Sequence, residues 1–277
     1  MPEAPDLEVI KEFLDANVSG SSVASISVLK STVVRSLVDD LAGDIPGRTI
    51  EGVHRRGKFL LLEFSGDRWL AINPMLTGAL QYCENNQRTL KKTCFVLHLQ
   101  DGQQDGRELR YLDDKQMGKV YYVKEEQLAQ VPVLSEQGPD VLSGISYEDF
   151  GQRLKKFHGE IKGVLTRGAF ISGIGNAYSD EILFAAGLSP FRRSRSLSQT
   201  ELQRLYESCP QVVHEAIDVL RERMGADVHV KIRDFLKVHN KGGQLCPTCG
   251  GNITQLNANQ RITSYCRHCQ PGMLIKN

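Results

Sequence analysis

The chain has 277 residues, of which 40% are hydrophobic and 24% are charged, the composition of a globular protein with room for two packed cores. Its most apolar N-terminal stretch is interrupted by Lys11, Glu12 and Asp15, which excludes a signal peptide and a membrane span there, so no membrane partner is expected. The charge divides unevenly, with 16 Lys and Arg against 23 Asp and Glu in residues 1–150, and 18 against 10 in residues 151–277. The basic second half favours a polyanionic partner, although two solvated surfaces of different composition explain the numbers equally well.

The first 130 residues predict a helix followed by a β-sandwich. Over residues 5–16, Pro5 suits the first helical position, Asp6 suits the positive end of the helix dipole, and apolar residues recur on one face. From about residue 20 to residue 124 the hydrophobic period changes to two, and turn-prone sequences separate the apolar runs SVASISVL, KFLLLEF, RWLAINPML, TCFVLHL and KVYYV. We therefore predict an α+β protein whose N-terminal domain, residues 1–130, is a helix on an antiparallel β-sandwich.

Helical periodicity dominates the chain after the β-sandwich. The stretch 131–144 is rich in Pro, Gly and Ser and predicts an interdomain linker. The helical segments that follow are 147–156, 160–167, 176–187 and 198–224. We therefore predict a helical domain at residues 145–235 and a separate, turn-rich module at residues 236–277.

Four of the seven cysteines lie in the last 32 residues, as two CxxC pairs separated by sixteen residues. The pairs are Cys246 with Cys249 and Cys266 with Cys269, a spacing typical of a four-thiolate zinc ribbon, and they predict one structural Zn²⁺ per chain. Two disulfides or redox dithiols are the alternative, but the clustering is unlike a secreted disulfide scaffold and favours a reducing, cytosolic compartment. The hairpin between the pairs would carry Arg261 at its tip, where it is either available to a phosphate or simply solvated.

The sequence SGIGNAYSDEILF predicts a helix that starts near Asn176. Free backbone N–H groups at a helix start bind anions, and Gly173 and Gly175 would let a ligand approach the backbone closely. Asn176 is therefore a candidate phosphate donor. A helix that Asn176 merely caps, with no ligand, explains the same residues.

Four motifs, in this order, resemble one family of DNA repair enzymes. They are MPEAPD at the start, RRGKFLL at 55–61, GIGNAYSDEILFAAGLSP at 173–190 and RITSYCRHCQ at 261–270. Together they span almost the whole chain and resemble formamidopyrimidine-DNA glycosylase and endonuclease VIII, the helix–two-turn–helix base-excision enzymes. The resemblance implies a helix–two-turn–helix domain at 145–235, a zinc finger at 236–277, and a monomer that acts on damaged double-stranded DNA in the cytoplasm, at the nucleoid of a prokaryote.

The resemblance also implies a bifunctional enzyme, a DNA glycosylase that is also an abasic-site lyase. Loss of the initiator methionine would leave Pro2 at the N-terminus, and its secondary amine would attack C1′ of the damaged nucleoside and form an iminium ion. Glu3 would transfer the proton that opens the sugar ring. The phosphates that flank the lesion would be bound by Lys58, which also assists catalysis, and by Asn176 and Arg261, so that the target nucleotide leaves the duplex.

The sequence departs from the purine-type members of this family in two loops. Their DPRRFG stands here as DDKQMG, so Gln116 replaces the Arg that faces the orphaned cytosine and Met117 replaces the Phe wedge. Their HLGMTG stands here as NPMLTG, so Leu76 replaces the inserting Met. Asp6 also replaces the usual Glu, and the segment after Met224 is short where those members carry a loop over 8-oxoguanine. Strand cleavage and backbone binding are thus better supported than a preference for 8-oxoguanine, and the preferred lesion stays open.

Two other functions fit part of the sequence. A catalytically weak protein that binds damaged or branched DNA on the same scaffold would explain the altered loop, but it has no need of Pro2, Glu3 and Lys58 together. A zinc-ribbon protein of RNA binding or translation would explain the cysteines but not the N-terminus. Base excision is therefore the first hypothesis and the binding protein the second.

Overall fold

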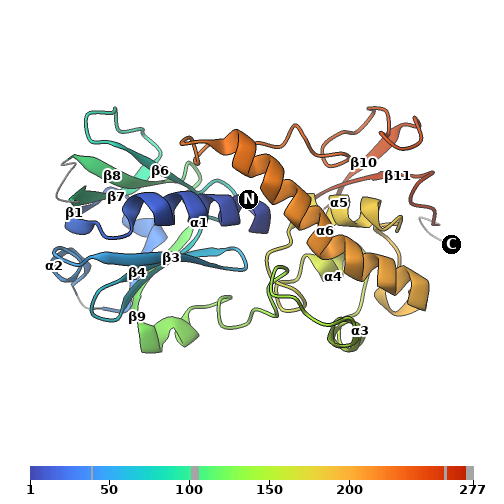
Figure 1. Ribbon diagram of the computed structural model, residues 1–277, viewed down its shortest axis with the longest axis horizontal. Helices are drawn as coiled ribbons and strands as arrows, with labels where there is room; N and C mark the ends of the chain where they lie inside the picture. The colour runs from blue at the N-terminus through green and yellow to red at the C-terminus, as the bar shows by residue number, and fades with distance from the viewer. Residues whose placement is uncertain (39, 101–105, 259–260, 273–277) are drawn as a thin grey trace. The chain divides into compact units, whose positions relative to one another are not determined.

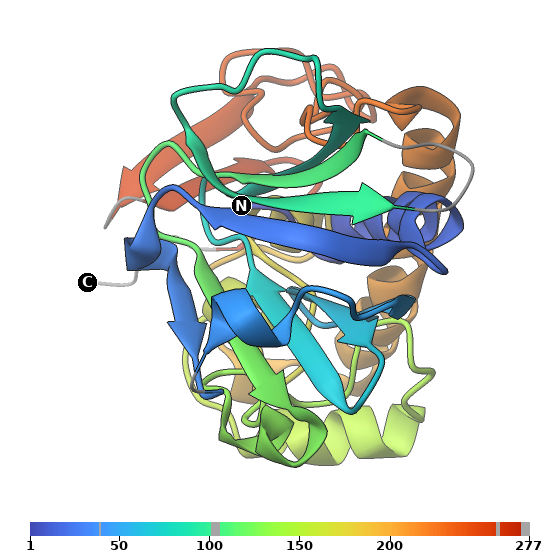
Figure 2. The ribbon, with the colours of Figure 1, turned by 90° about the vertical axis from the view of Figure 1, so that its left-hand side faces the viewer.

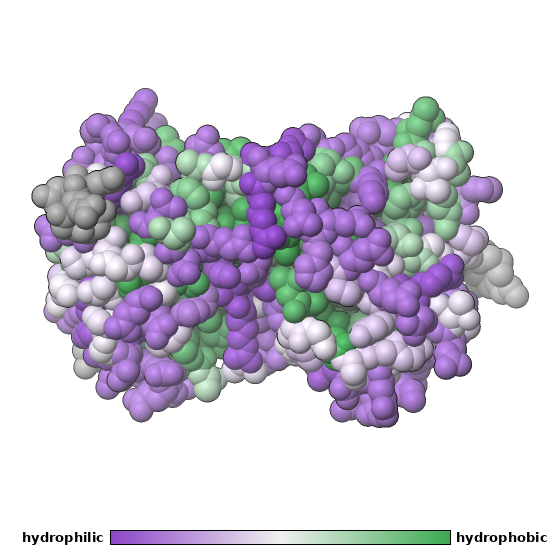
Figure 3. Space-filling view, viewed as in Figure 1, coloured by the Kyte–Doolittle hydropathy of each residue, from purple (hydrophilic) through white to green (hydrophobic). Residues whose placement is uncertain are grey.

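The chain folds into two compact units, which are described separately below. The first comprises Met1–Ser135 and Val219–Ile232, and the second comprises Glu136–Asp218 and Arg233–Asn277. The computed structural model describes residues 1–38, 40–100, 106–258 and 261–272. Within these ranges no helix is both long enough and apolar enough to cross a bilayer. Most of the face drawn in Figure 3 is hydrophilic.

Two β-sheets form the layers of a sandwich in the first unit (Figure 2). The four-stranded sheet has the order β1 (Ser22–Val28), β7 (Thr93–Gln100), β8 (Arg107–Leu112) and β6 (Ala79–Glu84). The five-stranded sheet has the order β2 (Val34–Ser36), β9 (Lys119–Lys124), β5 (Arg68–Asn73), β4 (Phe59–Phe64) and β3 (Ile50–Arg56). The predicted helix and β-sandwich are therefore confirmed.

One strand pair differs from the antiparallel prediction, because β2 runs parallel to β9. Four strands, β2, β3, β6 and β8, were also not among the predicted apolar runs. In β8 the reason is plain, since Glu108 and Arg110 are 5% and 1% exposed and form an ion pair of 2.6 Å. A buried charge is tolerated only with such a partner, so hydrophobic periodicity alone does not detect this strand.

Helix α1 (Ala4–Val18) packs against β3 and agrees with the helix predicted at 5–16. Asp15 Oδ1 accepts a hydrogen bond of 2.8 Å from the Val53 backbone N–H, and Glu8 Oε2 accepts one of 2.5 Å from Arg55 Nε. Leu7 is fully buried beneath this side of the helix. These contacts fix α1, which directly follows the candidate catalytic residues Pro2 and Glu3, relative to the sheet.

The second unit contains the predicted helices and the cysteine-bearing hairpin (Figure 1). Its elements are α3 (Tyr147–Lys155), α4 (Ile161–Leu165), α5 (Asn176–Ala185), η3 (Ser194–Ser196), β10 (Ile253–Ala258) and β11 (Arg261–Cys266). The remaining short elements, η1 (Ser31–Val33), α2 (Leu41–Asp44) and η2 (Glu125–Gln130), belong to the first unit. Helix α6 (Gln199–Met224) starts in the second unit and ends in the first, so the chain after it returns to the β-sandwich unit.

Candidate active site and DNA-binding residues

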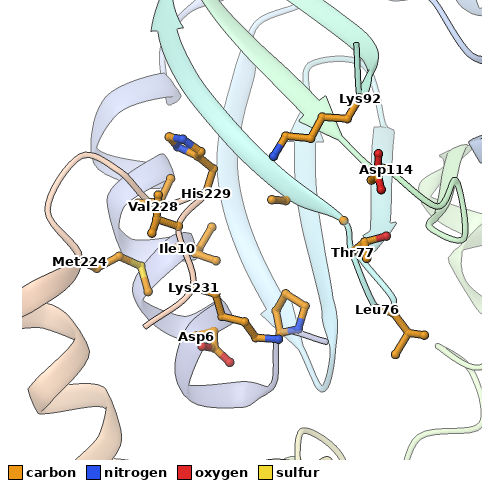
Figure 4. Close-up of a pocket in the computed structure, with 14 residues that line it drawn as sticks. Asp6, Ile10, Leu76, Thr77, Lys92, Asp114, Met224, Val228, His229 and Lys231 are labelled. Carbon is orange, nitrogen blue, oxygen red and sulfur yellow. The ribbon is translucent and has the colours of Figure 1, made fainter. Parts of the chain in front are cut away.

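A cavity of about 280 Å³ lies in the first unit, and Pro2 is one of its lining residues. Three separate parts of the chain form its walls (Figure 4). They are the start of the chain with α1 (Pro2, Asp6, Ile10), the loops of the sandwich with the start of β6 (Leu76, Thr77, Gly78, Ala79, Lys92, Asp114), and the end of α6 with the segment that follows it (Met224, Val228, His229, Val230, Lys231). The volume is close to the lower limit of about 300 Å³ for ligand pockets, which suits a single heterocyclic ring system rather than a larger ligand.

Pro2 and Glu3 lie directly before the first turn of α1. Pro2 is half-buried, whereas Glu3 is only 3% exposed. The backbone N–H of Glu3 donates a 2.8 Å hydrogen bond to Asp6 Oδ2, so Asp6 closes the start of the helix although it replaces the Glu usual in the family. Pro5 in the same turn has no backbone N–H group, and at a helix start such a group would have no partner within the helix. The local sequence therefore places the buried carboxyl group of Glu3 next to Pro2, which lines the cavity.

Lys58 lies in the two-residue turn between β3 and β4 and is half-buried. Gly57, in the same turn, has φ of 58°, a conformation that favours glycine. Arg55 donates to the carbonyl of Gly57 at 2.9 Å and to Glu8 of α1 at 2.5 Å, so one guanidinium ties this turn to the helix. Lys58 is not one of the residues that line the cavity, and its predicted role stays a prediction.

Leu76, Gln116 and Met117 lie on two loops that hydrogen bonds connect. The Thr77 hydroxyl donates to the carboxylate of Asp113 and accepts from the Lys115 backbone N–H at 3.3 Å. Leu76 and Met117 are 50% and 41% exposed, although both are large and apolar. Gln116 has φ of 51° and its Oε1 accepts from Thr32 Oγ1 at 2.7 Å. The structure thus places the three residues predicted to fill a vacated base position on neighbouring loops.

Glycine is required where the second of these loops ends. The backbone N–H of Gly118 donates a 2.6 Å hydrogen bond to the buried carboxylate of Asp113. A Cβ atom at Gly118 would stand 1.8 Å from the Tyr111 hydroxyl, which is far inside van der Waals contact. The buried Asp113 carboxylate and the Tyr111 hydroxyl therefore fix the end of the 113–118 loop, while the tip of the loop remains exposed.

Asn176 and Arg261 lie close together in the second unit. Asn176 is the first residue of α5, and its Nδ2 donates a 2.8 Å hydrogen bond to the carbonyl of Ile262. Arg261, the residue before Ile262, is exposed at the start of β11. The helix cap is Gly175, so Asn176 is the first helical residue rather than the cap, and a capped helix with no ligand stays the alternative. Binding of DNA by Asn176 and Arg261 stays a prediction.

A buried polar cluster that sequence reasoning missed joins α5 to the cysteine-bearing hairpin. Asp180 is 1% exposed, and its carboxylate lies 2.7 Å from both Lys162 Nζ and His239 Nδ1. Lys162 Nζ also donates to the Ile262 carbonyl at 2.6 Å, and Asp180 Oδ2 accepts from the Ser264 backbone N–H at 3.1 Å. The two adjacent acids of the motif YSDEILF, on an otherwise apolar helix, were the available signal.

The four predicted zinc ligands form one cluster. The Sγ atoms of Cys246, Cys249, Cys266 and Cys269 all lie within 4.8 Å of one another, with Cys246–Cys269 at 3.8 Å and Cys249–Cys266 at 3.4 Å. Tetrahedral zinc with Zn–S bonds of about 2.3 Å requires S–S separations of about 3.8 Å, so the donor set fits this ion. Burial would raise the pKa of Cys246, but the backbone N–H groups of Cys249 and Thr248 and the neighbouring thiols lower it to about 7. Burial and hydrogen bonds to the neighbouring thiols raise the pKa of Cys266 and of Cys269, so without a metal ion the cluster favours one thiolate, at Cys246, the form that zinc binds.

Three basic residues of the cavity were also missed by the sequence analysis. Lys92 precedes β7, and His229 and Lys231 lie in the segment that returns after α6. Burial lowers the pKa of His229, Asp227 opposes this effect, and the Lys92 ammonium lowers the pKa further. No motif marks these positions, because they meet only when residues 219–232 pack on the sandwich.

Comparisons with known proteins cover nearly the whole chain. Residues 1–120 match the formamidopyrimidine-DNA glycosylase N-terminal domain, and residues 138–226 match the formamidopyrimidine-DNA glycosylase H2TH domain. The formamidopyrimidine-DNA glycosylase of Desulforamulus reducens is 32% identical over 98% of this chain and 99% of its own, and that of Pelotomaculum thermopropionicum is 30% identical over the same shares. The crystal structure of Lactococcus lactis Fpg with DNA that contains N7-benzyl-Fapy-dG has a TM-score of 0.88 at 24% identity, and it covers 98% of this chain and 100% of that chain.

Proposed function

The chain belongs to the formamidopyrimidine-DNA glycosylase family, and from this membership we propose that it excises damaged bases from double-stranded DNA and then cleaves the strand through Pro2. The observation that carries the proposal is the position of Pro2 at the wall of a cavity large enough for one base, with the buried Glu3 beside it. The relatives are bacterial, so we further propose that the chain works in the cytoplasm, on the nucleoid, as the monomer that the family resemblance implies.

The proposed chemistry begins once Met1 has been removed. An α-amino group has a lower pKa than a lysine ammonium group, so part of the free Pro2 amine is neutral at working pH. Its lone pair forms a bond to C1′, and the electron pair of the glycosidic bond departs with the base, which takes up a proton. Glu3 delivers a proton to the ring oxygen as the sugar opens, and the Pro2 nitrogen loses its own proton to give the iminium ion. The iminium then acts as an electron sink for elimination of the 3′ phosphate.

Borohydride trapping tests this proposal directly. The mature protein should form a covalent adduct with abasic-site DNA in the presence of borohydride, because only an amine nucleophile gives an iminium that borohydride reduces. Peptide mapping should place the adduct on Pro2, and Pro2→Gly should keep part of the trapping because its terminal amine still forms a Schiff base. Retention of Met1 should abolish trapping while DNA still binds.

Two outcomes would contradict the proposal. An adduct on Lys58 with Pro2 unmodified would move the nucleophile to the β3–β4 turn. No adduct from a correctly processed N-terminus, together with preserved binding of damaged duplexes, would make the chain a damaged-DNA-binding protein on this scaffold.

Replacing Arg261 with Ala should weaken binding of all duplexes, damaged or intact, because a phosphate contact carries no base information. The slope of log affinity against log salt should become shallower by about one unit, since one counterion-releasing contact is lost. Arg267→Ala is the matched control, because Arg267 is also exposed but follows the opposite end of β11. Affinities measured over a salt series decide the matter, and a loss confined to one lesion would show that Arg261 reads a base.

Replacing Gln116 with Arg should shift the enzyme by about tenfold toward lesions opposite cytosine, because Arg offers charged donors to the acceptors of the orphaned base. The loop should tolerate the change, since neither side chain is branched at Cβ and the residue keeps φ of 51°. Gln127→Arg is the control, because Gln127 Oε1 likewise accepts one hydrogen bond, from the Lys124 backbone N–H at 2.9 Å. Base-release rates opposite each of the four bases give the result, and an unchanged profile would mean that the loop does not enter the duplex.

A further inference from the structure

The cavity at Pro2 presents two ammonium groups to whatever occupies it. Figure 4 shows the Lys92 and Lys231 side chains pointing into the cavity from different walls, Lys92 from the sandwich and Lys231 from the segment after α6. Both lysines are exposed, and neither forms an ion pair or side-chain hydrogen bond within the described ranges of the chain. Each ammonium group has three donors and no acceptor, so the cavity offers unused donors at two sides.

The floor of the same cavity is apolar. Ile10, Met224 and Val228 are 6%, 4% and 2% exposed, and Leu76 adds an apolar edge. A flat ring can therefore lie on this floor with its polar edges toward the lysines. The histidine at the cavity adds no positive charge at neutral pH, because its pKa lies below the ordinary value.

The two acidic residues of the cavity do not cancel the attraction of the two lysines for a negatively charged ligand. Asp6 is 3% exposed and already accepts the Glu3 backbone N–H at the positive end of α1, which stabilises its charge locally. Asp114 is exposed on the 113–118 loop, where water screens its charge. When a base fills the cavity and displaces water, the attraction of the two ammonium groups for an anion increases because the local dielectric constant falls.

From this arrangement we infer that the cavity selects oxidised bases that carry a negative charge at neutral pH, of which a carboxyl-substituted pyrimidine is the simplest. The inference rests on the proposed function, because it assumes that the flipped base enters the cavity next to Pro2. A neutral base of the same shape offers the ammonium groups carbonyl acceptors but no charge to pair with, and a base edge that offers only donors is opposed by them. Lys92 and Lys231 are thus specificity residues for the base.

The test compares two duplexes that differ by one functional group, 5-carboxyuracil and its neutral isostere 5-carbamoyluracil. Base-release rates are measured for the unchanged protein and for Lys231→Met and Lys92→Met, and the carboxyl-to-carbamoyl rate ratio is compared across proteins. The two bases differ in intrinsic leaving ability, but that difference is the same for every variant and cancels. Each substitution should lower the ratio by about tenfold, the effect of one favourable charge pair in a site from which water is excluded.

The controls separate this inference from the proposed function. Lys91→Met removes an exposed neighbouring charge that does not line the cavity and should leave the ratio unchanged. Cleavage of a ready-made abasic site, which has no base, is measured for every variant as a report on the chemistry at Pro2, and it should stay unchanged in Lys91→Met. An unaltered ratio with intact abasic-site cleavage would overturn the inference alone, and so would an equal loss on both duplexes, which would place the lysines on phosphates. If the unchanged protein releases neither base but is still trapped on abasic-site DNA by borohydride, the inference alone fails. If it is not trapped either, the proposed function fails, and the ratio of dissociation constants for the two duplexes then tests the inference.

Discussion

Replacing Glu3 with Gln is expected to slow base release by about 100-fold or more, while cleavage of a ready-made abasic site stays within a few-fold of its original rate. The two steps differ because release of a base needs the sugar ring to open with the proton that Glu3 gives to the ring oxygen, whereas a ready-made abasic site has no base to release and is already in equilibrium with its open aldehyde. Gln has almost the same shape as Glu, and the backbone hydrogen bond from residue 3 to Asp6 does not depend on the side chain, so α1 should start where it does now. Single-turnover rates of base release and of strand cleavage, measured on two duplexes, give the comparison.

The control for this change is Glu51→Gln. Glu51 is an exposed residue of β3 in the same unit, so the substitution removes the same charge away from the cavity. Both rates should stay unchanged in the control. A parallel fall of both rates in Glu3→Gln would indicate that Glu3 supports the position of Pro2 rather than a proton transfer.

Replacing Cys249 with Ser should release the metal and lower DNA affinity by about tenfold or more, while the β-sandwich unit stays folded. The apolar cluster of the finger consists of Val238, Ile253 and two of the ligand cysteines, Cys246 and Cys266, so it offers little core without the ion. Binding of structural zinc contributes about 10–16 kcal/mol in small zinc modules, far more than such a core supplies. Loss of zinc therefore should loosen the β10–β11 hairpin, and with it the position of Arg261.

Metal analysis and hydrogen exchange measure the two effects. The unchanged protein should carry one zinc per chain, and backbone amides of β10 and β11 should exchange faster in Cys249→Ser than in the unchanged protein. Cys83→Ser is the control, because Cys83 is buried in β6 and lies outside the cluster. A finding of two disulfides by mass spectrometry, or full zinc content in Cys249→Ser, would contradict the zinc assignment.

The sequence by itself determined those parts that depend on local pattern. The α1 helix, the apolar strands β4, β5, β7 and β9, and the helices α3 to α6 follow from periodicity and turn residues. The four thiolates followed from their spacing, since a CxxC turn brings its two sulfurs together regardless of the remaining fold. The family followed from four motifs whose residues are close in sequence, so no knowledge of the packing was needed.

Tertiary structure alone decided which distant residues meet. Strand β8 contains two buried charges, Glu108 and Arg110, that pair with each other and with groups from other parts of the chain. Asp180 is likewise buried beside Lys162 and His239, which reach it from elsewhere in the chain. The cavity at Pro2 is completed by Val219–Ile232, which packs with the β-sandwich although more than 200 residues separate Pro2 from Lys231. The physical reason is that pairing of buried charges and convergence of loops arise from long-range packing, and periodicity reports only on neighbours within a few turns of helix or one strand.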